Sequence, residues 1–376
     1  MPVNVLGFQS HRDHFAIDFE RECLRERMAE MRSKRIEDHR LAEKYGLEDN
    51  RGWQLSRARQ SIRQDLNWEA NLIECDYRPF DRRFCYLSGA VMDRPRRELQ
   101  LHVAGKRNLC LNVVRQTKMP FWQHAVVSRL PAPALYVELK DGSNLFPLYL
   151  YPDPDANGDL FPNGRMRHPN LDPKFIEDVS TRLRLKFIPD GKGDLKKTFG
   201  PEDVFHYIYA ISHSPTYRER YADFLKRDFP HVPLTSDRQL FRNLCALGSA
   251  LVSLHLLESP VLSNAITRYP VRGDDRVEKG CPRHLAPGQP EPATGKLLKH
   301  GRVYINNEQY FDGVPPEIWN FHIGGYKVCE KWLKDRRGHA LSFDDLTHYQ
   351  KIVVALSETI RLMGEIDRVI PSWPVE

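Results

Sequence analysis

The chain has 376 residues, with 41% hydrophobic side chains and a formal net charge of +6. One hydrophobic core rarely serves a chain of this length, so we expect two or more subdomains, and the hydrophobic content excludes intrinsic disorder. No apolar run reaches the ~18 residues that span a bilayer, and the N-terminus lacks the regions of a signal peptide. We therefore expect a soluble, cytoplasmic protein with no membrane partner.

Residues 1–72 are predicted to form a helical connector. The stretch from Asp18 to Tyr45 is rich in helix formers with closely mixed charges, and Gly46 follows it as a stop signal. A second, shorter helix is predicted from about Leu55 to Glu69.

Residues 73–151 have a different pattern, with β-branched and aromatic runs at 83–88, 108–114, 123–128 and 146–151. Gly, Pro and polar residues separate these runs, which is typical of short strands, so this segment is predicted to form a small mixed sheet. Residues 152–173 then concentrate Pro, Gly, Asn and Asp, which predicts a loop and the first subdomain boundary.

Residues 152–265 are predicted to form a helical scaffold. Ser214 is a candidate N-cap before a proline, and the helix that follows places Tyr217, Tyr221 and Phe224 on one face. Ser236-x-x-Gln239 is a candidate capping box. The helix after it carries an apolar stripe of leucines: Leu240, Leu244, Leu247, Leu251 and Leu254.

Residues 266–376 are predicted to form a C-terminal strand and helix segment. A Pro/Gly-rich loop at 280–295 precedes a strand at 302–306, and the last helix opens at the capping box Ser342-x-x-Asp345 and runs to about Val369. Leu341 and Leu346 are placed as a hydrophobic staple. The predicted fold class is α+β: a helical connector, a small mixed β-sheet subdomain and a C-terminal helical subdomain.

The sequence contains none of the common motifs for phosphate loops, dinucleotide loops, nucleophile elbows or zinc helices. Its seven cysteines are scattered, which favours reduced thiols and predicts no metal site. One fragment, Glu138-Leu139-Lys140, resembles the Glu-x-Lys end of a metal-dependent nuclease strand, but no acidic residue lies between Glu98 and Glu138 to supply a second ligand. The cluster at 10–15 (SHRDHF) is interpreted as structural. No catalytic residue is predicted.

Positive charge concentrates between Tyr77 and Leu130, where eleven Lys and Arg face three Asp and Glu. Arginine side chains bind phosphates and guanine edges with two hydrogen bonds, and the interleaved amides add hydrogen-bonding groups. This window predicts a footprint on a polyanion. The alternative is a solvated face whose arginines pair with acids elsewhere in the chain.

Three stretches resemble the C-terminal specificity region of type ISP restriction-modification enzymes and related adenine-specific DNA methyltransferases. They are the run YRPFDRRFCY, the later Arg94-Pro95-Arg96 and the long segment 203–233. The motifs Val303-Tyr-Ile-Asn306 and Lys331-Trp-Leu-Lys-Asp-Arg-Arg337 extend the resemblance toward the C-terminus. The resemblance implies that this chain binds duplex DNA as a target recognition module, with residues 73–151 as its DNA recognition segment and residues 266–376 completing the domain.

The resemblance also implies partners: a methyltransferase domain that binds S-adenosylmethionine, and helicase and nuclease domains, in one polypeptide or in a partner chain. This chain has neither a [DN]-P-P-[YF] motif nor a Gly-rich loop for S-adenosylmethionine, so no cofactor is predicted for it. A metal-dependent nuclease using Glu138 and Lys140, and an RNA-binding or structural module, stay open as alternatives. The predicted DNA-binding residues are Arg78, Arg82, Arg83, Arg94, Arg96, Arg97, Asn112, Arg115, Gln116, Lys118, Arg129, Lys331, Lys334, Arg336 and Arg337.

Overall fold

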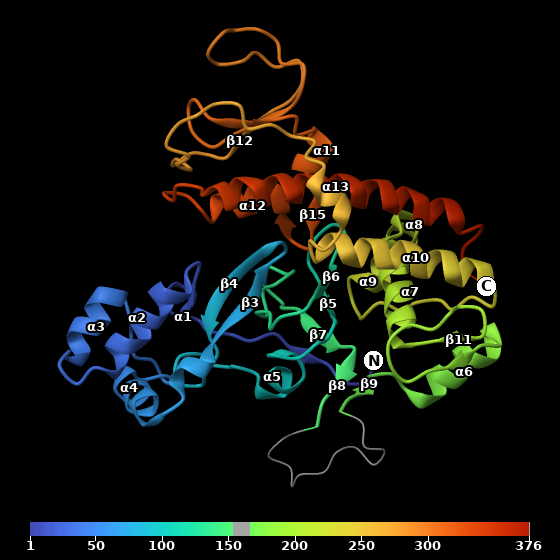
Figure 1. Ribbon diagram of the computed structural model, residues 1–376, viewed down its shortest axis with the longest axis horizontal. Coiled ribbons are helices and arrows are strands. Elements are labelled where there is room, and N and C mark those ends of the chain that lie inside the picture. The colour runs from blue at the N-terminus through green and yellow to red at the C-terminus, as the bar shows by residue number, and fades with distance from the viewer. Residues whose placement is uncertain (153–165, 376) are drawn as a thin grey trace. The chain divides into compact units, whose positions relative to one another are not determined.

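A computed structural model describes residues 1–152 and 166–375 of the chain (Figure 1). The predicted loop at 152–173 therefore lies largely outside the described residues. The chain divides into two compact units. The first comprises Met1–Asn112, Ser128–Tyr136 and Gly142–Asn170, and the second comprises Val113–Val127, Val137–Asp141 and Leu171–Glu376.

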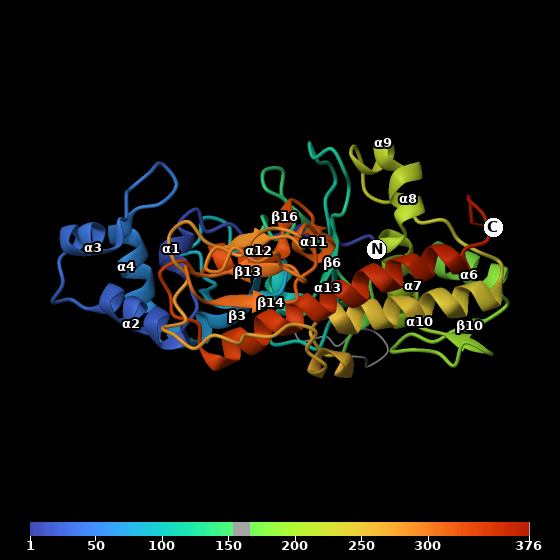
Figure 2. The same ribbon diagram turned by 90° about the horizontal axis from the view of Figure 1, so that it is seen from above.

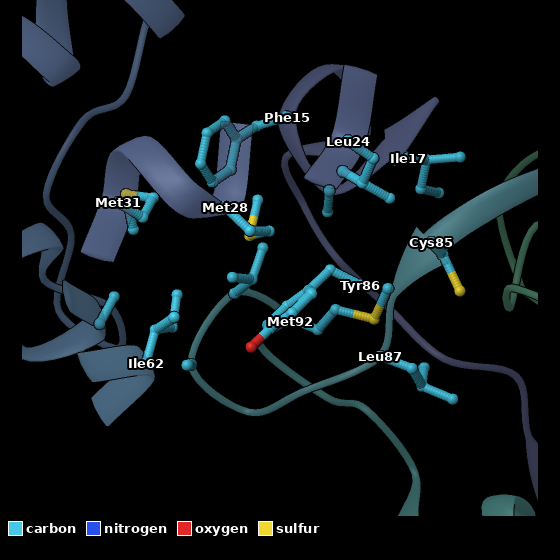
Figure 3. Close-up of a cluster of buried hydrophobic side chains, with 14 of the residues drawn as sticks. Phe15, Ile17, Leu24, Met28, Met31, Ile62, Cys85, Tyr86, Leu87 and Met92 are labelled. Carbon is cyan, nitrogen blue, oxygen red and sulfur yellow. The ribbon is translucent and has the colours of Figure 1, made fainter. Parts of the chain in front are cut away.

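Helices and a three-stranded antiparallel sheet share the core of the first unit. The helices are α1 (Asp13–Ala16), α2 (Arg21–Arg32), α3 (Asp38–Tyr45) and α4 (Leu55–Gln64), followed by the 3-10 helix η1 (Trp68–Asn71). The sheet has the order β2-β4-β3, with bounds Ile17–Asp18, Asp81–Tyr86 and Leu72–Arg78. Apolar side chains from α2, α4 and β4 meet in one cluster, and Figure 3 shows Met28, Ile62 and Tyr86 within it.

The predicted helix from Asp18 to Tyr45 is wrong in one respect, because it is two helices, α2 and α3. The break has a tertiary cause: the buried guanidinium of Arg59, from α4, donates to the carbonyl oxygens of Met31, Ser33 and Ile36. These bonds satisfy carbonyls that a continuous helix would have used itself. The stop at Gly46 is confirmed, since this residue adopts φ +59°, which favours glycine.

A second sheet has four short strands in the order β1-β7-β5-β6. Their bounds are Val5–Leu6, Asn144–Pro147, Cys110–Val113 and Ala125–Ser128, and β1 pairs with β7 in antiparallel register. The first unit contains β1, β7, most of β5 and Ser128 of β6, together with α5 (Arg97–Val103) and the antiparallel pair β8 (Tyr149–Leu150) and β9 (His168–Pro169). The predicted runs at 108–114 and 123–128 contain β5 and β6, the run at 83–88 overlaps the second part of β4, and the run at 146–151 is divided between the end of β7 and β8.

Three long helices pack together in the second unit: α7 (Pro201–His213), α10 (Arg238–His255) and α13 (Phe343–Val369). Both views show α13 lying alongside α10 (Figures 1 and 2). Gly248 brings α10 against α7, because a Cβ atom there would lie 1.9 Å from the carbonyl oxygen of His206. Helices α6 (Pro173–Leu183), α8 (Pro215–Arg220), α9 (Ala222–Leu225), α11 (Pro316–Trp319) and α12 (Val328–Lys334) surround this core, with the 3-10 helix η2 (Pro260–Ser263) after α10.

Small sheets complete the second unit. They are the parallel pair β10 (Lys186–Phe187) and β11 (Thr198–Phe199), the antiparallel sheet β12-β13-β14 (Arg283–Leu285, Arg302–Tyr304, Tyr310–Asp312) and the hairpin β15-β16 (His322–Ile323, Tyr326–Lys327). Helices and small, mostly antiparallel sheets together confirm the predicted α+β class.

Two predicted helix caps are confirmed. The Ser214 hydroxyl accepts the N–H of Tyr217 at the start of α8, and Ser342 and Asp345 form the capping box of α13. The Ser236 capping box is wrong, since the N-cap of α10 is Asp237, whose carboxylate accepts the N–H groups of Gln239 and Leu240. A charged carboxylate is the stronger acceptor for these N–H groups.

Two predicted apolar faces need correction. Phe224 is 76% exposed instead of sharing a buried face with Tyr217, because α8 ends at Arg220 and the new helix α9 changes the phase of the side chains. The leucine stripe of α10 is buried at four positions, but Leu247 is partly exposed. All seven cysteines are free thiols. Within the described residues no helix is long and apolar enough to cross a membrane.

Candidate nucleic-acid interface

The β3–β4 hairpin places its three arginines in different surroundings. Arg78 is buried, lies 4.0 Å from the centre of the Tyr77 ring and donates to the Tyr77 carbonyl oxygen at 2.6 Å. Arg83 pairs with Asp81 at 2.7 Å and also stacks on the Tyr77 ring. Only Arg82 is largely exposed, at 49% of its side chain. The hairpin therefore presents one of its three guanidinium groups to a ligand, and the other two hold its own aromatic side chains.

Asp76 connects this hairpin to the segment after β6. Its carboxylate accepts the backbone N–H groups of Arg129 and Leu130, each at 3.2 Å, and lies 3.4 Å from the guanidinium of Arg82. Burial raises the pKa of Asp76, although Arg82 and the two N–H groups oppose the shift. Arg129 is partly buried and reaches the carbonyl oxygen of Asn108. Through these contacts the Arg129 region connects the β3–β4 hairpin to Asn108 within the first unit.

Asn112 lies inside the sheet and not at a surface. It is fully buried on β5, and its amide donates to the Ser128 hydroxyl at 2.9 Å on the neighbouring strand β6. A side chain so enclosed cannot contact a base edge without opening the strand pair.

The second arginine group, residues 94–97, is more accessible. Arg94 and Arg97 are exposed, and the backbone of Arg94 is held by two hydrogen bonds to Gln9. Arg96 adopts φ +58° and lies 3.6 Å from Glu98. In the neighbouring SHRDHF cluster, His11 and Arg12 both contact the carboxylate of Asp93 at 2.6 Å.

The β5–β6 loop (residues 114–124), which belongs to the second unit, carries three of the predicted residues at the surface. Arg115, Gln116 and Lys118 are all exposed, and Arg115 lies 3.6 Å from the exposed carboxylate of Asp228. Two cations and an amide within four positions can contact phosphates and a base edge together. This loop is the densest exposed group of the predicted set.

The base of this loop holds a buried acid. Glu138 is 3% exposed and His124 is fully buried, and His124 Nε2 lies 3.3 Å from Glu138 Oε2. Burial raises the pKa of Glu138, but the contacts with His124, Thr117 and the N–H of Leu139 outweigh it and lower the pKa to about 2. Glu138 is thus an internal carboxylate paired with a histidine, whereas Lys140 is exposed.

This placement does not favour the nuclease alternative. Within the residues that the structure describes, no group of three or more His, Cys, Asp or Glu side chains is arranged to hold a metal ion.

Most of the Lys and Arg side chains of α12 and the following turn already contact other groups of this chain. Lys331 and Lys334 form ion pairs with Asp335 and Glu330 on the same face of the helix. Arg336 is buried, with its guanidinium 3.5 Å from the centre of the Trp332 ring, while the exposed Arg337 donates to the carbonyl oxygen of Cys281 at 2.6 Å. Lys334 and Arg337 are the more accessible members of this group.

A further basic group was missed by our sequence analysis. Residues 182–197, from the end of α6 to the strand β11, hold six Lys and Arg against two Asp. Asp194 accepts the backbone N–H groups of Lys197, Thr198 and Lys196, which holds the pKa of Asp194 below its ordinary value and fixes the turn. The side chains of Lys196 and Lys197 are exposed and form no ion pair with a described residue. A charge count over short successive windows identifies this group.

These features define an α+β fold with several exposed basic groups, on the β3–β4 hairpin, the β5–β6 loop, the turn at Asp194 and the end of α12. The chain belongs to the family of Type ISP C-terminal specificity domains, because the model of that family matches residues 1–365. No curated protein matches the chain in sequence.

Three solved structures share the fold. One is the cryo-EM structure of a DrdV–DNA complex, with a TM-score of 0.67 and 17% identity over 96% of this chain and 35% of that chain. Another is the ATP-dependent Type ISP restriction-modification enzyme LlaBIII bound to DNA, with a TM-score of 0.68 and 16% identity over 99% of this chain and 24% of that one.

The third is a nuclease-deletion mutant of the Type ISP restriction-modification enzyme LlaGI in complex with a DNA substrate mimic. It has a TM-score of 0.63 and 16% identity over all of this chain and 33% of that one. The chain thus spans between 24% and 35% of the length of these three proteins.

Proposed function

We propose that this chain is the target recognition module of a Type ISP restriction-modification enzyme and binds double-stranded DNA at a preferred sequence. The observation that carries the proposal is the β5–β6 loop, where Arg115, Gln116 and Lys118 are exposed together in a Type ISP specificity domain. The three similar structures are of proteins in complex with DNA or a DNA substrate mimic, which supports DNA as the ligand.

The surroundings of these basic groups indicate which of them contact phosphates and which contact bases. The exposed arginines and lysines supply phosphate contacts that are independent of sequence, whereas amide and arginine groups held on a short, rigid loop discriminate between bases. Arg78, Asn112 and Arg336 belong to the predicted set, but their burial assigns them to holding the fold in this scheme. Arg82, Arg94, Arg97, Arg115, Gln116 and Lys118 are the proposed ligand-facing residues of the basic window.

Catalysis is assigned to other domains. We propose that a methyltransferase domain, and helicase and nuclease domains where present, act together with this chain in the cytoplasm. S-adenosylmethionine does not fit this chain, which lacks the motif residues for it, so the methyltransferase domain would bind the cofactor.

The primary experiment measures duplex binding as a function of salt. With roughly five to eight phosphate contacts, each releasing about 0.9 counterion, the plot of log affinity against log salt should have a slope near −5 to −7. A slope shallower than about −2 would exclude the basic groups as a DNA footprint.

Two controls separate the alternatives. A duplex RNA competitor tests the RNA-binding alternative, which requires RNA to compete at least as well as DNA. Incubation of DNA with the purified chain and magnesium tests the nuclease alternative, which requires nicking that is abolished by Lys140→Ala. We expect neither outcome, and no incorporation of radiolabelled methyl groups by this chain alone.

A further inference from the structure

Two other segments of the second unit form backbone hydrogen bonds with the β5–β6 loop, and a third segment is bound to one of them. The N–H of Thr117 donates to the carbonyl oxygen of Lys226 at 3.1 Å, just after α9. At the other end of the loop, the N–H of Gly324 donates to the carbonyl oxygen of Gln123 at 2.8 Å. The N–H of Gly325 donates to Val137, which precedes the buried acid. The loop is therefore bound on both sides and not only at its strand ends.

The β15–β16 turn is built for this close approach. Gly324 adopts φ +58°, and a Cβ atom there would lie 1.7 Å from the carbonyl oxygen of Val137. Glycine is thus required both for the backbone conformation and for the space. The ring of Phe121, on the loop, also packs edge-on against His322 of the same hairpin, with their centres 5.0 Å apart.

The pair Glu138 and His124 lies where these segments meet. His124 Nδ1 accepts the N–H of Gln123 at 3.3 Å, and its other nitrogen, Nε2, lies 3.3 Å from Glu138 Oε2. The second carboxylate oxygen of Glu138 accepts the N–H of Leu139 at 2.6 Å. The pair thus connects the β5–β6 loop, at Gln123, to the segment 137–141.

Burying an ionised carboxylate costs free energy, because its charge leaves water, and contacts such as those of Glu138 offset that cost without adding much net stability. What such a buried carboxylate does supply is one preferred geometry, since its charge is poorly solvated anywhere else in the interior. The β5–β6 loop is therefore held in one geometry by a buried carboxylate, which a turn that only connects two strands does not need.

We propose that Glu138 and His124 are positioning residues that hold the β5–β6 loop so that Arg115 and Gln116 meet the base edges of duplex DNA in a single orientation. The proposal rests on the target recognition function above and adds how the loop is held so that it can select a DNA sequence. Glu138 itself does not touch DNA, because it is 3% exposed.

The variant Glu138→Gln tests this, since it keeps the shape of the side chain and removes its charge. The probe is the duplex that the wild-type chain enriches from a randomised pool, with singly altered duplexes as competitors. We expect discrimination between the two to fall about tenfold, within the range for a lost base contact, while affinity for non-specific duplex and the salt slope stay unchanged. Hydrogen exchange should increase most in residues 114–124.

Glu308→Gln is the matched control, because Glu308 is exposed in the same unit and its substitution removes the same charge. Thr117→Val is a milder second variant, which removes a hydroxyl that contacts Glu138, and it should shift discrimination in the same direction if Glu138→Gln fails to fold.

The outcomes are distinct. If the wild-type chain enriches no sequence, the target recognition function fails and the positioning role falls with it. If the wild type selects a site but both variants discriminate as well as it does, only the positioning role is overturned. The same holds if the variants lose specific and non-specific affinity in proportion, because that is the signature of a general loss of structure.

Discussion

The buried pair also makes a quantitative prediction about stability. Glu138→Gln removes a carboxylate whose pKa is lowered from 4.5 to about 2. At about 1.4 kcal/mol for each pH unit, the lowered pKa corresponds to about 3 kcal/mol of unfolding free energy at pH 7. Because the pKa is lower in the folded state, this contribution is present above pH 4.5 and is lost as the pH falls from about 4.5 to about 2.

Urea unfolding of the wild type and the variant measures this difference. We expect it to be about 3 kcal/mol at pH 7, about 2 kcal/mol at pH 3.5 and about 1 kcal/mol at pH 2.5. Glu308→Gln, at an exposed position, should differ from the wild type by less than about 1 kcal/mol at every pH. A Glu138→Gln difference that is equally small, or that is independent of pH, would refute the assignment of Glu138 as a buried, ionised partner of His124.

The remaining predictions concern DNA binding. Replacing Arg115 or Gln116 by alanine should reduce discrimination between the preferred and altered duplexes by about 1 to 3 kcal/mol, measured by competition binding, and an unchanged ratio would exclude them from base contact. Lys334→Ala should weaken all duplexes equally and lower the salt slope by roughly one, whereas a change in sequence preference would contradict a phosphate role. Replacing Lys196 and Lys197 together should lower the slope by roughly two without altering preference, and an unchanged slope would show that the turn at Asp194 lies outside the footprint.

Local chemistry made part of this structure predictable from the sequence. The caps at Ser214 and Ser342 were predicted correctly, because a hydroxyl satisfies N–H groups only two or three residues away. The left-handed stop at Gly46 and most of the leucine stripe on α10 depend on equally short distances along the chain. The basic window and the family resemblance are likewise properties of residue order alone.

Which arginines are open to a ligand was decided by tertiary structure. Arg78 and Arg82 lie four positions apart in one hairpin, yet one is buried against Tyr77 and the other is half-exposed beside Asp76. Arg82 is paired with Asp76, and strand alternation would place Arg78, two residues after Asp76, on the same side of the sheet. The bulge between Asp76 and Arg78 pairs Arg78 with Asp81, so the two arginine side chains point in different directions. A charge count treats all the arginines alike, so it located the basic window without separating its surface residues from its structural ones.

Contacts between distant residues account for the other differences. Arg59 ends α2 from a separate helix, and no pattern within residues 18–45 indicates that a guanidinium will bind their carbonyl oxygens. His124 and Glu138 are fourteen positions apart, and their pairing depends on the β15–β16 hairpin nearly two hundred residues further along the chain. The sequence by itself determined the caps at Ser214 and Ser342, the stop at Gly46, most of the leucine stripe on α10 and the location of charge. Burial and pairing were decided only by the fold, because the free energy of a charged side chain depends on partners that the fold brings to it.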